Sequence, residues 1–239
     1  MKINVNWCSF RDSFDNASSL DMLAIDPIPV LKFYPEMATA DYRKCPAHTN
    51  QFKNTYAMCS PIDFEVIINK EEKWCDVVEP KNLPPECFNP RFGEERESPY
   101  PIFGLRINRV LFSPVDSPKD IYVEQIEPVL DWDRDRNIRV IEGNFNISRW
   151  TRPLECAFEQ RSKNITVKFK RGQPMYYARF STDDPEDVIV LNRSEITKEM
   201  FDDSDRCVGL KHYAPANKLK DLYDIRDAYV NSLKNHEVL

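Results

Sequence analysis

The sequence predicts a mainly β protein: a single antiparallel β-sandwich or jelly-roll-like domain that ends in one α-helix. Short apolar segments with a two-residue alternation recur through most of the 239 residues. Five glycines against 18 prolines indicate turns made by proline, asparagine and aspartate, as in a rigid β protein with many loops. Apolar residues at helical spacing occur only near the C-terminus. We therefore expect an irregular N-terminal arm over 1–26, a sandwich over 27–216 and a packed helix over 217–235.

Four segments in the middle of the chain show the strongest strand pattern. Apolar residues alternate with polar ones in each of them, as in a strand with one buried face. The polar connections between the last three have hairpin length, so the four segments are expected to form an antiparallel meander with one solvent-facing side. The segments are Gly143 to Ile147, Leu154 to Phe158, Ile165 to Phe169 and Tyr176 to Phe180.

Weaker patterns before this meander predict further strands. Prolines around Ile28 to Tyr34 indicate a sheet edge. The segment Ile62 to Ile68 is expected to pair with Trp74 to Val78. Six prolines between Pro80 and Pro101 predict the longest loop, which is also a candidate for a partner contact.

Other elements are expected on both sides of the meander. Ser194 has the residue type that caps a helix, so a short helix through Phe201 is expected before the C-terminal one. Further strands are expected at Ile102 to Phe112, Ile121 to Val129 and Val188 to Leu191.

Charge and cysteine usage restrict the function classes. A net charge of -6 argues against a basic nucleic-acid-binding surface. No stretch reaches the roughly 18 apolar residues of a membrane span, and the first residues lack a signal-peptide pattern. Seven dispersed cysteines without a Cys-x-x-Cys pair favour buried thiols in a reducing compartment. We expect a cytoplasmic protein without nucleic-acid or membrane partners.

No motif predicts a cofactor or a metal. Asp131 to Asn137 has the oxygen-ligand spacing of a calcium loop, but Arg136 occupies the position of the glycine that the loop needs, which favours a solvated turn. Cys45 and His48 have zinc-like spacing without a second close pair, and are expected to be a core cysteine and a loop histidine.

Enzyme classes built on β-sandwiches also find little support. A metal-dependent oxygenase would use two histidines and a carboxylate, commonly beginning with His-x-Asp/Glu. The residues two positions after His48, His212 and His236 are not acidic. Neither a nucleophile elbow nor a glycine-rich phosphate loop is present. We therefore predict no catalytic residue.

A cluster of aromatic and arginine residues is the remaining candidate site. Aromatic rings stack on sugars and guanidinium groups bind anions in a bidentate manner, so a glycan or a carboxylate is the expected ligand, with a protein partner as the alternative. The alternative is that the cluster only stabilises the fold: Trp150 and one tyrosine are then core residues, and the arginines pair across strands with Glu155 and Glu159. The candidate residues are Arg149, Trp150, Arg152, Tyr177 and Arg179.

Three groups of segments carry a family resemblance: Cys45-Pro46-Ala47-His48-Thr49-Asn50 with Ser60-Pro61-Ile62-Asp63, Ile147-Ser148-Arg149-Trp150-Thr151-Arg152-Pro153, and Gly172-Gln173-Pro174-Met175-Tyr176-Tyr177-Ala178-Arg179-Phe180. They resemble an uncharacterised protein family of marine tailed phages and bacteria. The resemblance implies a phage or marine microbial origin, with the protein in the virion or the host cytoplasm if a phage encodes it, and supplies no catalytic residue. We expect a non-enzymatic binding or structural module, with self-association left open. The alternative is a jelly-roll metal-dependent oxygenase-like enzyme with atypical ligands, starting with His48 and His212.

Overall fold

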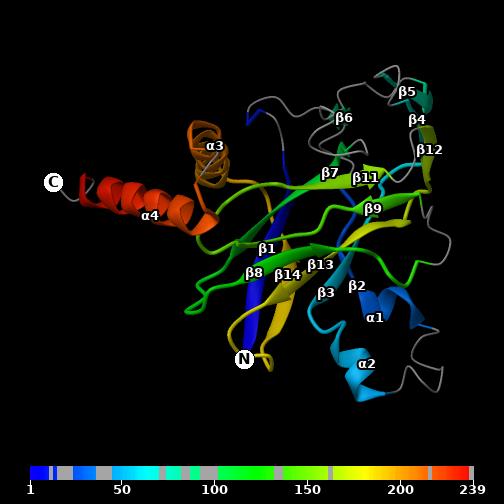
Figure 1. Cartoon of the computed structure of the whole chain (residues 1–239). Helices are drawn as coiled ribbons and strands as arrows, with labels where there is room; N and C mark the ends of the chain where they lie inside the picture. The colour runs from blue at the N-terminus through cyan, green and yellow to red at the C-terminus, as the bar shows by residue number, and fades with distance from the viewer. Residues whose placement is uncertain are drawn as a thin grey trace.

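The computed structural model describes residues 1–10, 13–14, 24–35, 45–69, 74–81, 87–91, 102–131, 137–160, 164–214 and 217–236. These residues form three β-sheets, two short helices and a C-terminal pair of helices (Figure 1). The predicted fold class is confirmed: the chain is mainly β, its sheets are consistent with a β-sandwich, and a helix ends the chain.

The largest sheet, sheet A, has the strand order β14-β1-β7-β11-β9, and β6 also pairs with β7. The pair β1 and β14 is parallel, and the other pairs are antiparallel. The strands are β1 (Lys2–Ser9), β6 (Phe88–Arg91), β7 (Ile102–Pro114), β9 (Ile138–Val140), β11 (Leu154–Gln160) and β14 (Val188–Arg193).

Sheet B has the order β10-β8-β13-β3-β2, and sheet C has the order β12-β4-β5. The predicted pairing of the segment from Ile62 with the segment from Trp74 is confirmed as β4 with β5. The strands of sheet B are β2 (Ile28–Pro29), β3 (Thr55–Cys59), β8 (Tyr122–Ile126), β10 (Gly143–Asn146) and β13 (Pro174–Ser181). Those of sheet C are β4 (Phe64–Asn69), β5 (Trp74–Glu79) and β12 (Asn164–Phe169).

Two expectations for the first 35 residues are wrong in part. The irregular arm expected over 1–26 begins with a strand inside sheet A, because Val5 and Trp7 alternate with asparagines and point into the core, and residues 11–12 and 15–23 of that arm lie outside the described residues. The strand expected from Ile28 does lie at the edge of sheet B, but it is limited to β2, after which the chain turns into the short helix α1 (Val30–Phe33). Val30 is buried in a cluster with Phe52 and Tyr177.

The predicted meander is also wrong, although its four strands exist. β10 and β13 lie in sheet B, β11 in sheet A and β12 in sheet C, so none of the four pairs with the next one. Instead, β13 pairs with β3 and β8. Its two faces are both buried: Tyr176 belongs to the main core, whereas Tyr177 packs on the other side of sheet B with Val30 and Phe52.

The main core is dominated by aromatic rings that connect the three sheets. Phe112 of β7 and Phe180 of β13 meet edge to face with their ring centroids 5.0 Å apart. Phe158 of β11 contacts Phe103 of β7 at 5.2 Å and Phe169 of β12 at 5.6 Å. Such pairs add to the stability gained by burying the rings. Sheets A, B and C therefore share one core.

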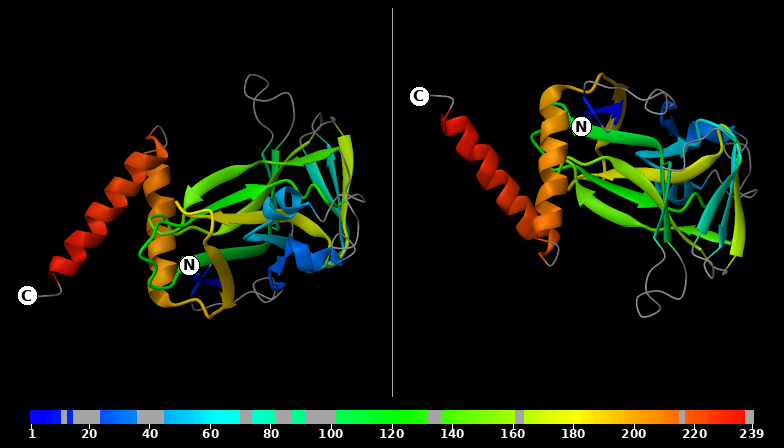
Figure 2. Two further views of the ribbon diagram at one scale, coloured as in Figure 1. Left: turned by 90° about the horizontal axis from the view of Figure 1, so that it is seen from below. Right: turned by 90° about the horizontal axis from the view of Figure 1, so that it is seen from above.

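Two helices complete the chain, α3 (Lys198–Tyr213) and α4 (Leu219–His236). The expected cap at Ser194 is wrong, because the Ser194 amide donates to the Trp7 carbonyl beside the sheet. Thr197 caps α3 instead, its hydroxyl accepting the amide of Met200. In Figure 2, α3 lies across one end of the sheets and α4 leads away from the body. Within the described residues, no helix combines the length and apolar character of a membrane span.

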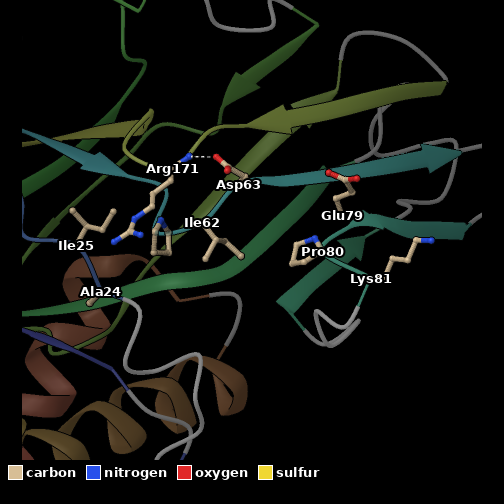
Figure 3. Close-up of a pocket in the computed structure, with 9 residues that line it drawn as sticks. Ala24, Ile25, Ile62, Asp63, Glu79, Pro80, Lys81 and Arg171 are labelled. Carbon is tan, nitrogen blue, oxygen red and sulfur yellow. Dashed lines mark hydrogen bonds between the residues drawn. The ribbon is translucent and has the colours of Figure 1, made fainter.

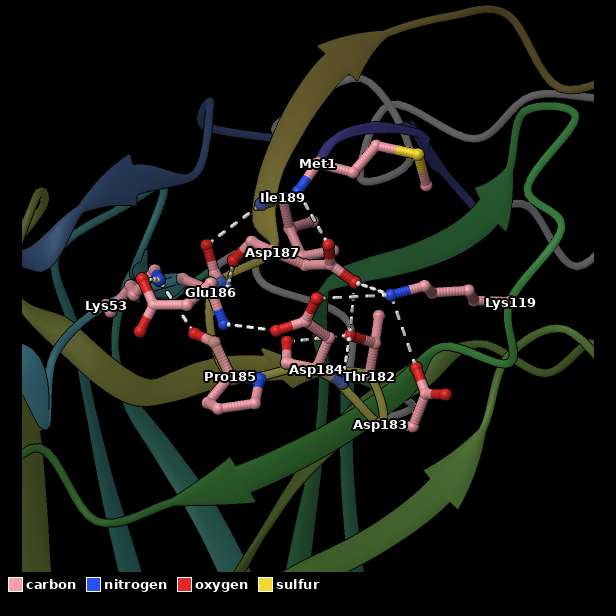
Figure 4. A network of polar contacts seen from close by, with 11 residues as sticks. Met1, Lys53, Lys119, Thr182, Asp183, Asp184, Pro185, Glu186, Asp187 and Ile189 are labelled. Atoms are coloured by element: carbon pink, nitrogen blue, oxygen red, sulfur yellow. Dashed lines mark hydrogen bonds and ion pairs between the residues drawn. The ribbon is translucent and has the colours of Figure 1, made fainter.

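A buried carboxylate ties the loop between β13 and β14 to two distant parts of the chain (Figure 4). One Asp187 oxygen lies 2.7 Å from the N-terminal ammonium of Met1, and the other accepts hydrogen bonds from Lys119 at 2.8 Å and Thr182 at 2.7 Å. The Lys119 hydrogen bond, followed by the other two, holds the pKa of Asp187 well below its usual range. The carboxylate is therefore charged throughout the neutral range.

Asp187→Asn is expected to lower the melting temperature at pH 7, because Lys119 and the ammonium lose their charged partner. The wild-type advantage should be complete above the unfolded pKa of about 4 and should disappear as the pH falls towards the lowered folded pKa. Asp183→Asn is the control, since Asp183 is exposed and 3.5 Å from the same lysine. Equal melting curves for the two variants at pH 7 and pH 3 would contradict this role.

Candidate functional site

Arg149 is one of the predicted site residues, and its partner is the chain's own C-terminal helix. Its guanidinium donates to Asp227 and to Asp224 of α4, at 2.8 and 2.7 Å. It also lies 5.4 Å from the ring centre of Tyr223. The hydrogen bonds to Asp224 and Asp227 raise the pKa of Arg149. This arginine is therefore occupied in fixing the first turns of α4.

Trp150 and Arg152 lie beside the same helix. Trp150 is only 2% exposed, and its ring centroid is 5.9 Å from that of Tyr223. The Tyr223 hydroxyl in turn accepts the backbone amide of Asn146 at 2.8 Å. Arg152 lies over the ring of Phe145 at 5.2 Å, and burial lowers its pKa. The structure thus brings the first three predicted residues together, but against α4 rather than on an open face.

The other two predicted residues lie elsewhere. Tyr177 is fully buried in the cluster on the far side of sheet B, where its hydroxyl donates to that of Tyr34 at 3.3 Å. Burial, reinforced by this hydrogen bond, raises its pKa. Arg179 pairs with Glu124 on the adjacent strand β8. The expected single face is not formed, because no hairpin joins β11 to β13 and because Tyr177 faces the second cluster.

Asp203 of α3 is the residue of this region that the sequence did not single out. Its carboxylate is buried and accepts hydrogen bonds from Arg226 of α4 at 2.6 Å, from Arg206 at 3.0 Å and from the Thr151 hydroxyl. Burial by itself raises the pKa of Asp203, but the hydrogen bonds from Arg226 and Thr151 outweigh it and hold the pKa below its usual range. The sequence feature that could have indicated a buried acidic partner was Arg226, a charged residue within the apolar stripe of the predicted helix.

The outer turns of α4 differ from its first turns in how they contact the rest of the protein. The helix has 18 residues and a length of about 27 Å, and among its described side chains those of Asp224, Arg226 and Tyr229 contact the body. Figure 2 shows that the rest of the helix leads away from the body. Leu222 and Tyr223, in its first turns, are buried. Ile225 and Tyr229 are 41% and 45% exposed, and Tyr229 additionally lies under the Arg206 guanidinium at 4.8 Å. The first turns of α4 are therefore fixed by ion pairs, while the rest of the helix projects and exposes apolar side chains to solvent.

A hollow of about 760 Å³ lies on another side of the molecule, between the start of β4 and the end of β5 (Figure 3). Ile62 and Arg171 border it, with the Arg171 guanidinium extending beside Ile25. Among the described lining residues, the carboxylates of Asp63 and Glu79 equal the cations of Lys81 and Arg171 in number, so these charges are balanced.

The residues considered for metals do not converge. His48 lies on α2 (Pro46–Asn50), and its Nδ1 is 2.9 Å from the Gln51 side-chain amide. His212 is in the last turn of α3, at the opposite end of the molecule (Figure 1). In the described part of the chain, no three His, Cys, Asp or Glu side chains gather closely enough to hold a metal ion. Residues 132–136 of the calcium-like segment lie outside the described residues.

The arrangement around α4 combines ion-paired first turns with the exposed side chains of Ile225 and Tyr229. Comparison with protein-family models, with curated proteins and with solved structures found no match for this chain.

Proposed function

We propose that this chain is a non-enzymatic binding module with a structural role, in which α4 is the contact element and a second copy of the chain is the partner. The observation that carries the proposal is the projecting helix, held at its base by Arg149 and Asp203 and exposing Ile225 and Tyr229. An isolated helical segment shorter than about 12 residues is marginal in water, so the outer turns of α4 gain stability from a covering surface. The resemblance to phage proteins would place this role in a virion or an infected cell.

Charge along α4 favours a second copy in antiparallel orientation. Of the three aspartates in the first half of the helix, Asp224 and Asp227 are paired with Arg149 and Asp221 is not, whereas the sequence of the last turn has Lys234 and His236. Antiparallel pairing puts Asp221 of one helix beside the basic end of the other. A two-fold arrangement also covers the apolar faces of both α4 helices at once, because the same surface patch of each chain contacts the other.

Light scattering coupled to size-exclusion chromatography tests the proposal. The wild-type chain is expected to elute as a dimer at micromolar concentration. Tyr229→Glu should weaken the dimer by about tenfold or more, because aromatic residues at the centre of an interface contribute most to affinity. Asn231→Glu is the control, as Asn231 is exposed on a different face of the same helix.

Two results would contradict the proposal. A wild-type chain that stays monomeric up to about 100 μM, a concentration corresponding to weak binding, would exclude a second copy as the partner. Stoichiometric iron or another transition metal in the purified protein, measured by elemental analysis, would favour the oxygenase-like alternative. That result would direct attention to His48 and His212 despite their separation.

A further inference from the structure

A second hollow, of about 700 Å³, lies beside the outward face of β12 and the turn that follows it. Its wall joins three kinds of group: aromatic rings, a hydroxyl and cations. The residues that matter are Phe33, Tyr34, Thr166, Lys168, Lys170 and Arg171. Arg171 borders this hollow and the charge-balanced one, so the two hollows adjoin at that residue.

Among the described lining residues of this hollow, positive charge is in excess. The carboxylate among them, Asp131, accepts a hydrogen bond from the Gln173 side-chain amide at 3.0 Å. Lys168 is paired with Glu65 at 2.7 Å. Within the described ranges, the Lys170 ammonium and the Arg171 guanidinium form neither an ion pair nor a hydrogen bond. Among the described residues, the side chains of Lys170 and Arg171 are therefore not held by an acid, and Figure 3 shows the Arg171 guanidinium extended beside Ile25 in the charge-balanced hollow.

The turn that presents these cations is held by its backbone. The Gly172 amide donates to the Ser60 carbonyl, and the Ser60 amide donates to the Gln173 carbonyl, both at 2.8 Å. The Arg171 amide donates to the Asp63 carboxylate at 2.7 Å. Gly172 has a φ of 82°, a conformation that glycine adopts without strain. Because the turn is fixed before a ligand arrives, binding does not have to order it.

The aromatic side of the hollow indicates what kind of anion fits. Phe33 and Tyr34 are half-buried, with ring centroids 4.7 Å apart, and they border the hollow together with Thr166 and Lys168 of β12. Ring faces suit the apolar face of a sugar, the Thr166 hydroxyl suits its hydroxyl groups, and an arginine beside a lysine suits a carboxylate.

We propose that this hollow binds an acidic glycan, with a sugar ring packed on Phe33 or Tyr34 and a sugar carboxylate held by Lys170 and by Arg171, whose guanidinium turns from Ile25 towards the ligand. The site is separate from α4, so it stands or falls independently of the proposed dimer. It assigns a ligand class to a surface formed by α1, β12 and the turn after β12.

Isothermal titration calorimetry of the full chain with tetragalacturonate tests this site. The wild-type chain should bind it, and fully methyl-esterified tetragalacturonate should bind at least tenfold more weakly because the carboxylates are neutral. Lys170→Ala/Arg171→Ala should weaken binding at least tenfold. Lys218→Ala/Lys220→Ala removes the same charge from exposed positions near the start of α4 and should leave the affinity unchanged.

Several results would overturn the assignment. Absence of binding to the wild-type chain, equal binding of the methyl ester, or equal weakening by the α4 control would each do so. Tetraglutamate binding as tightly as tetragalacturonate would replace the glycan by an acidic peptide. If the double variant loses the wild-type melting transition, the exposed single change Lys170→Gln takes its place with the same expectation.

Discussion

Phe180→Ala should lower the free energy of unfolding by about 3–5 kcal/mol, the cost of truncating a buried phenylalanine to alanine. Phe180 is 2% exposed and lies between sheets A and B, where its ring meets Phe112 at 5.0 Å and Tyr56 at 5.9 Å. The substitution leaves a cavity that both sheets border. Backbone pairing of β13 on its two sides restricts collapse into that cavity. Equilibrium urea unfolding at pH 7 measures the change.

Val188→Ala provides the comparison for Phe180→Ala. Val188 begins β14 and is 46% exposed, so its truncation should cost less than about 1 kcal/mol. A similar loss in both variants would mean that the contact between sheets A and B is not the main source of stability. A small loss for Phe180→Ala alone would place that ring outside a well-packed core.

Local alternation predicted the strands of this protein but not their neighbours. The alternation of apolar and polar residues within a strand shows which side chains share a face. For this reason the segments around Phe158, Phe169 and Phe180 were correctly assigned as strands. Pairing depends on residues far along the chain: β13 pairs with β3, more than 100 residues earlier. Hairpin-length connections indicated a meander, yet burial of both faces of β13 required these distant partners.

In the candidate site, too, the partners of the side chains could not be predicted from the local sequence. The arginine and aromatic cluster was predicted to be a ligand site, but a guanidinium that can hold a ligand carboxylate can equally hold Asp224 and Asp227 of its own chain. These partners are more than 70 residues away and belong to a helix whose position the sequence does not specify. Asp203 was missed for a related reason, since an aspartate in a polar helix usually faces solvent.

Asp203→Ala is the substitution with the largest expected effect on α4. It leaves Arg226 without its partner at 2.6 Å, and Arg206 and Thr151 lose theirs as well. We expect a loss of about 2–3 kcal/mol, below the 3–5 kcal/mol of a fully buried pair because Arg226 keeps 17% of its side chain exposed. Asp205→Ala is the control, as Asp205 is exposed on the same helix. The wild-type advantage should fade as the pH drops below about 4, because the pKa of Asp203 is lowered in the folded state.

Hydrogen exchange of backbone amides in α4 tests most directly whether Arg149 and Asp203 hold this helix on the body. In the wild-type chain, amides from Leu222 to Val230 should exchange slowly. Asp203→Ala should speed their exchange at least tenfold, while amides of β13 should respond less, since local opening of a helix does not require global unfolding. Unchanged protection of α4 in Asp203→Ala, with Asp205→Ala as the reference, would contradict the account.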